Sequence, residues 1–270
     1  MPGIPFSPNS PDLEAVRRII FERLRREPDW SHVDRNADGY APYVQYQGSF
    51  NRGEERNALV FAAEEVFWQL VVEEIIAPGL NANSLDWPRF HLTSHGREVL
   101  KSGPGNPHDP TGYLRRVAEK VQQADPTVLA YLGESLSSFR HGDRVASTLL
   151  LGIAAERVFL LLCDSLAAAL ISPAEQESFA KLLDRFPMKP KLDWVHQKIQ
   201  SVKAPRFPEN ANIMVTAIYD FVRSQRNDLG HPRETPPAVT QEDAFVNLQV
   251  FPRYYETAEE VRAFLAANKV

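Results

Sequence analysis

The chain has 270 residues, enough for one large domain or two of ordinary size, and 43% of them are apolar, which supports hydrophobic cores. With 30 basic and 35 acidic residues its formal net charge is −5, which excludes a general nucleic-acid coat protein, so any nucleic-acid role needs a local basic patch. The single cysteine, Cys163, excludes an intrachain disulfide and a zinc site built from thiolates. The first residues lack the charged and then apolar pattern of a signal peptide, so we expect a cytoplasmic protein.

Periodicity and turn signals predict a mainly α protein with two domains. We expect a small α+β domain over 1–110, a linker helix over 111–124 and a helical bundle with a C-terminal tail over 125–270. In chain order the expected elements are helices over 12–27 and 54–76, a strand within 40–50, a strand over 89–92 followed by a helix, helices over 127–139 and 144–170, a helix opened by Ser172 and Pro173, helices over 192–202 and 210–230, an extended piece over 244–251, and a last helix over 257–269.

The phrase Leu-Thr-x-x-Gly-Arg-x-x-Leu, residues 92–100, marks one edge of the first domain, where Thr93 or Ser94 is placed to cap a helix. It resembles the strand-and-helix edge of many winged-helix domains. That resemblance implies either a scaffold or dimerising domain or a DNA reader, and both alternatives stay open.

The longest apolar run, residues 145–171, is long enough to cross a bilayer. Glu156 and Arg157 lie at its middle, and Asp164 follows about two turns later. Because charges at the centre of a membrane span are costly, we expect a buried helix of a soluble bundle and no membrane contact.

Six residues at the end of the predicted helix over 210–230, Arg226-Asn227-Asp228-Leu229-Gly230-His231, carry the strongest chemical signal. Arginine binds phosphate by charge and paired hydrogen bonds, and histidine is the side chain best suited to move a proton near neutral pH. Gly230 and Pro232 end the helix, which lets Arg226, Asn227 and His231 converge on one mouth. The alternative is that Arg and His only meet the negative end of the helix dipole.

A helical bundle whose last core helix ends in Arg-Asn-x3-His resembles the HEPN superfamily, and the resemblance covers roughly residues 125–235. It implies a metal-independent endoribonuclease, with no cofactor and no metal, in a bacterial toxin or phage-defence setting. His231 would be the general base or acid at the ribose 2′-hydroxyl, Arg226 would hold the scissile phosphate, and Asn227 would orient His231 or bind the phosphate. The products would carry a 2′,3′-cyclic phosphate.

The same resemblance implies RNA as partner, a homodimer through the motif helix, and a possible antitoxin or regulatory protein. Two rival functions remain open. One is a non-catalytic HEPN module that binds RNA or a protein partner. The other is a DNA-binding regulator that uses the N-terminal domain.

Two further groups of residues are candidates for supporting roles. Glu156 can pair with Arg226 and fix its orientation, or it can be an exposed residue at a helix edge. Basic side chains between 188 and 207, with Asp193 as the one acid, can guide RNA or form a solvated helix face. They are Lys189, Lys191, Lys198, Lys203 and Arg206. The spacing of His91, His95 and His108 does not predict a metal site.

Overall fold

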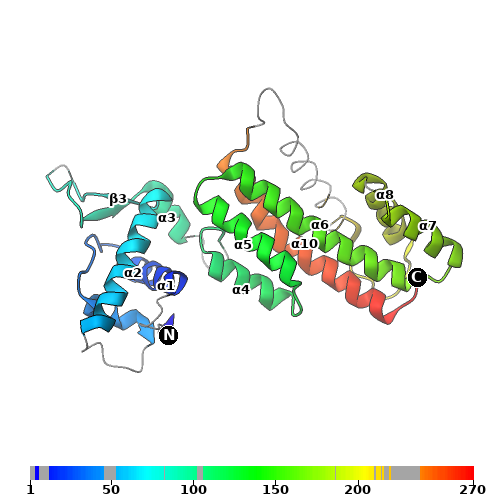
Figure 1. Ribbon diagram of the computed structural model, residues 1–270, viewed down its shortest axis with the longest axis horizontal. Helices are drawn as coiled ribbons and strands as arrows, with labels where there is room; N and C mark the ends of the chain where they lie inside the picture. Colours follow the sequence, from blue (N-terminus) through cyan, green and yellow to red (C-terminus); the bar gives the residue numbers. More distant parts are fainter. Residues whose placement is uncertain are drawn as a thin grey trace. The chain divides into compact units, whose positions relative to one another are not determined.

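The structure is a computed structural model (Figure 1). It describes residues 4–5, 12–45, 53–81, 83–101, 106–185, 187–209, 211–213, 215, 219 and 238–270. The fold is mainly helical, as the sequence predicts. Contacts divide the chain into two compact units, Met1–Thr111 and Gly112–Val270.

The N-terminal unit combines helices with two small sheets, shown from blue to cyan in Figure 1. The parallel pair is β1 with β2, and the antiparallel hairpin is β3 with β4. Its elements are β1 (Ile4–Pro5), α1 (Leu13–Arg26), the 3-10 turns η1 (Ala37–Gly39) and η2 (Ala41–Tyr43), β2 (Val44–Gln45), α2 (Gly53–Val72), β3 (Ile76–Pro78), β4 (Phe90–Leu92) and α3 (Ser94–Lys101).

The core of this unit lies between α1, α2 and the hairpin. Trp30, Phe67 and Phe90 form a cluster of edge-on and tilted rings with centroids 5.1–5.5 Å apart, a favoured arrangement for aromatic side chains. Arg17 of α1 and Glu73, just after α2, form a buried ion pair at 2.5 Å. Removing either partner would leave the other charge buried, so this pair fixes how α1 meets the end of α2.

Two predictions for this unit need correction. The helix expected over 54–76 ends at Val72, because Glu74 adopts a positive φ of 58° and Ile76 enters β3. Within 40–50, only Val44–Gln45 forms a described strand, and the preceding residues form the 3-10 turns η1 and η2. The helix after β4 begins as expected, and Thr93 caps it by accepting a hydrogen bond from the Gly96 amide at 2.8 Å.

The C-terminal unit is a helical bundle, coloured from green to red in Figure 1. The helices that the structure describes in full here are α4 (Pro110–Lys120), whose first turn contains the division between the units, α5 (Pro126–Arg140), α6 (Arg144–Ala169), α7 (Pro173–Leu183), α8 (Met188–Ser201) and α10 (Gln241–Ala267). A short turn makes α5 and α6 an antiparallel hairpin, and α10 packs along α6. The two helices end together, since Val270 N–H donates to Ala169 O at 2.9 Å.

Side chains fix where several of these helices begin. Asp125 caps α5 by accepting from two backbone amides, and Ser172 caps α7 with Pro173 in the first turn, as the sequence predicts. Thr240 and Asp243 form a capping box at the start of α10. Asp143 precedes α6 but makes no capping hydrogen bond through its side chain.

The extended piece predicted over 244–251 is wrong, because these residues form the first part of α10. Buried residues recur at Ala244, Leu248, Phe251 and Tyr255, which is helical spacing. Pro252 lies inside α10 without ending it. The helix predicted over 257–269 is therefore the second half of one 27-residue helix.

Candidate functional site

The motif residues Arg226, Asn227 and His231 lie outside the described residues. The structure describes the chain on either side of them, at Tyr219 and from Ala238 onward. These two points are the described residues nearest to the motif on either side.

Tyr219 anchors the chain seven residues before Arg226. Its buried ring stacks on Phe159 of α6, with centroids 4.4 Å apart and planes 5° from parallel. It also lies near Tyr254 of α10, at 6.4 Å and 19°. Ala211 and Val215 are buried too, so the described residues at four-residue spacing face the bundle. The sequence analysis did not single out Tyr219 or this aromatic stack: it placed Ile213 on the apolar face of this helix, whereas Ile213 is 60% exposed.

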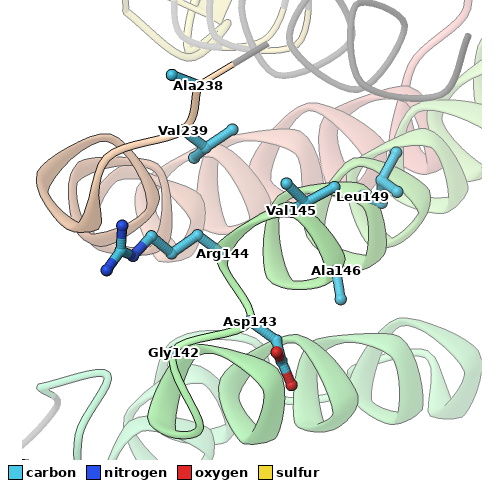
Figure 2. Close-up of a pocket in the computed structure, with 8 residues that line it drawn as sticks. All are labelled: Gly142, Asp143, Arg144, Val145, Ala146, Leu149, Ala238 and Val239. Carbon is cyan, nitrogen blue, oxygen red and sulfur yellow. The ribbon is translucent and has the colours of Figure 1, made fainter. Parts of the chain in front are cut away.

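On the C-terminal side of the motif, the described chain resumes at Ala238, beside the start of α6. Ala238 and Val239 line a shallow hollow of about 680 Å³ together with residues 142–146 and Leu149. Figure 2 shows Val145, Leu149 and Val239 around this hollow, with the Arg144 side chain extending away from Leu149. The hollow is mainly apolar, and Arg144 is the basic residue among those that line it.

Both points lie along one face of α6. Phe159 and Val145 are 14 residues apart, about 21 Å along the helix axis. The partly buried Glu156 lies on this side, about 60° around the helix from Phe159. Asp164, the other acid of α6, is exposed and lies about 140° away. Glu156 is therefore the acidic residue of α6 nearest the face where Tyr219 packs.

The neighbouring charged residue, Arg157, forms an ion pair within the bundle. Its Nη2 donates to Asp125 Oδ2 at 2.9 Å, and the same carboxylate accepts from the amides of Thr127 and Val128. The Arg157 guanidinium holds the pKa of Asp125 below its ordinary value, and the carboxylate raises the pKa of Arg157. This ion pair ties the start of α5 to the middle of α6.

The basic residues between 188 and 207 differ in burial and in ion pairing, although they look alike in the sequence. Lys189 pairs with Asp193 at 3.2 Å, and Lys198 pairs with Glu175 of α7 at 2.9 Å. Lys191 is only 7% exposed. Lys203 and Arg206 are exposed on the chain that follows α8. The Lys189 side chain is still 53% exposed, so Lys189, Lys203 and Arg206 are the exposed basic residues of this stretch.

One aromatic residue of that stretch, Trp194, is partly buried and packs against the core of the bundle. Trp194 stacks on Phe179 of α7 with centroids 4.0 Å apart and planes 16° from parallel. One face of its ring is therefore occupied by α7.

Within the described part of the chain, no group of three or more His, Cys, Asp and Glu residues is placed to hold a metal ion. His91 Nδ1 lies 2.6 Å from Gly79 O, and the His95 and His108 rings meet edge to face at 5.0 Å. Burial raises the pKa of Cys163 to about 12, so it stays a thiol and makes a poor nucleophile.

Among the described helices, α6 is long and apolar enough to cross a membrane. Half of the most apolar 18-residue stretch of α6 is buried inside the bundle, and the helix carries the charged residues Glu156, Arg157 and Asp164. These features are those of a core helix in a soluble bundle. Comparisons with protein-family models, with curated proteins and with solved structures found no match.

Proposed function

We propose that the C-terminal unit is a metal-independent endoribonuclease of the HEPN type. The motif Arg226-Asn227-x3-His231 would supply the chemistry, and the helical bundle of the C-terminal unit supports the proposal. The observation that carries the proposal is the Tyr219–Phe159 stack, because it holds the chain seven residues before Arg226 against the face of α6 beside Glu156.

The proposed reaction is an attack of the ribose 2′-oxygen on the adjacent phosphorus. His231 accepts the 2′-hydroxyl proton, the new O–P bond forms, and the bond to the 5′-oxygen breaks as that oxygen takes up a proton. Arg226 stabilises the charge on the non-bridging oxygens, and Asn227 orients His231 or donates to the phosphate. Glu156 positions Arg226. The products are a 2′,3′-cyclic phosphate and a 5′-hydroxyl.

The partners follow from the same proposal. RNA would approach over the exposed Lys203 and Arg206, whose charges suit phosphate contacts. A homodimer through the motif helix, a controlling antitoxin or regulatory protein, and a toxin or phage-defence setting belong to the resemblance and are proposed with it.

The test compares variants of the full chain on total cellular RNA in EDTA. Arg226→Ala and His231→Ala should each lower the cleavage rate at least about a hundredfold, since acid–base and phosphate-binding groups contribute on that scale. His141→Ala is the matched control, because His141 is an exposed histidine at the end of α5. Fragments should carry cyclic phosphate ends.

Each other outcome points to a defined rival. Equal cleavage by all four proteins would refute the site assignment. If folded wild-type protein retains RNA in a filter assay but does not cut it, the unit is a non-catalytic binding module. If the wild-type protein retards DNA in a gel, and this retardation is lost without residues 84–101 but not without His231, the N-terminal unit is a DNA reader.

A further inference from the structure

The N-terminal unit exposes a stripe of large apolar side chains along α2. Phe61 is 66% exposed, Trp68 48% and Val72 65%. Steps of seven and four residues place the three within about 40° of one another around the helix. The opposite side of α2, including Leu59 and Leu70, is buried in the core, so the stripe is not needed to hold the unit together.

The β3–β4 hairpin extends this stripe. Trp87 stacks on Trp68 with centroids 4.9 Å apart and planes 27° from parallel, and Leu85 is 69% exposed. Arg89, the basic residue of the hairpin loop, donates to Ser84 of the same loop. Contiguous exposed apolar side chains of this kind mark interaction sites in soluble proteins, in contrast to single exposed ones.

The charges around the stripe are negative and identify the kind of partner. Glu65 is exposed between Phe61 and Trp68, and Glu64 is beside it on α2. Glu74 and Asp86 are exposed just after α2 and in the hairpin loop. Such a rim repels nucleic-acid phosphates and anionic lipids, and a second copy would bring like charges together.

We propose that this stripe binds a basic amphipathic helix of a partner protein. Apolar side chains of that helix at i, i+3 or i+4, and i+7 would pack on Phe61, Trp68 and Val72, with the two tryptophans as anchors. Lysine or arginine side chains beside them would meet Glu64 and Glu65. This proposal does not depend on the ribonuclease proposal.

The test titrates the full chain with a designed helical peptide of about 18 residues, five turns, made of Leu on one face and Lys on the other. Its counterpart carries Glu in place of each Lys. Tryptophan emission of the protein reports binding, because Trp68 is half exposed in the stripe. The Lys peptide should bind with a Kd on the order of 10 µM, and the Glu peptide at least about tenfold more weakly.

Variants locate the contact. Phe61→Glu combined with Val72→Glu should lower the affinity for the Lys peptide at least about tenfold. Glu65→Lys exchanges one exposed charged residue for another of opposite sign. It should lower the affinity for the Lys peptide and raise the affinity for the Glu peptide. Ile171→Glu, at an exposed isoleucine of the other unit, should leave both affinities unchanged.

Three results would overturn the proposal. The first is equal affinity of the wild type and the Phe61→Glu, Val72→Glu variant for the Lys peptide. The second is that the Lys and Glu peptides bind the wild type with equal affinity and also bind the Glu65→Lys variant with equal affinity. The third is a wild-type dimer in sedimentation that Phe61→Glu with Val72→Glu dissociates, because the stripe would then bind a second copy.

Discussion

Asp125 accepts hydrogen bonds from Arg157 and from the first two amides of α5 that need a partner. The same residue donates its own amide to Tyr255 of α10 at 2.7 Å. One side chain and its backbone thus connect three helices of the bundle. The sequence predicted a helix starting near 127, but the long-range partners Arg157 and Tyr255 could not be read from local spacing.

Arg157→Gln should make the C-terminal unit unfold at a higher pH in acid. The folded-state pKa of Asp125 is lowered from 3.8, first by its hydrogen bond with Arg157, so its stabilising contribution is complete above 3.8 and is lost as pH falls through the folded value. Removing the guanidinium raises that folded pKa, so the loss begins at a higher pH. Acid titration followed by far-UV circular dichroism measures the midpoint.

Lys181→Gln provides the control for that titration. Its pair with Glu177 is exposed on both sides, and exposed pairs contribute little. We therefore expect an unchanged midpoint. A shift as large as that of Arg157→Gln would mean that net charge, and not the Asp125 contact, controls acid unfolding.

At the level of elements, α3 lies directly against the strand that follows α2. A Cβ added at Gly96 would come 1.9 Å from the carbonyl oxygen of Ile75, and a backbone atom cannot move away as a flexible side chain can. Gly96→Ala should therefore destabilise the N-terminal unit by about 1–3 kcal/mol, the usual effect of overpacking. Urea unfolding followed by tryptophan emission measures it, because Trp30, Trp68 and Trp87 lie in this unit.

Gly133→Ala tests the same exchange where there is room. Gly133 is inside α5, and an added Cβ would meet nothing within 4 Å. Because alanine favours a helix over glycine, we expect this variant to stabilise the bundle by about 0.5–1 kcal/mol. Destabilisation by both variants to the same extent would show that the close approach to Ile75 is not the cause.

Helices with clear caps were predicted well, and elements set by tertiary contacts were not. Ser172 with Pro173 and Thr93 placed the starts of α7 and α3 because capping is local chemistry. The first part of α10 was taken as extended, since aromatic and β-branched residues there favour strands when packing is ignored. As a helix, this segment buries Ala244, Leu248 and Phe251 against the bundle, and this packing outweighs the local preference for a strand.

At the scale of the molecule, the chemistry proposed for the motif comes from residue types alone, whereas the contacts of the described residues required the structure. The aromatic stack at Tyr219 and the ion pairs of Lys189 and Lys198 depend on residues far apart in sequence or on side-chain geometry. The basic stretch therefore looked more uniform in the sequence than it is. The apolar stripe on α2 was also missed, because apolar residues surround this helix on all sides.

Two separate cores suggest that the units unfold independently. One core draws its buried residues from Val16 to Val99, and the other from Tyr113 to Leu265. In a Trp194→Phe background, emission reports the N-terminal unit alone, since the three remaining tryptophans lie there.

Gly96→Ala should then shift the emission midpoint to lower urea. Asp125→Ala should shift the circular dichroism transition and leave emission in place, because losing this cap costs about 1 kcal/mol in the bundle only. Coincident shifts of both signals in both variants would show one cooperative core.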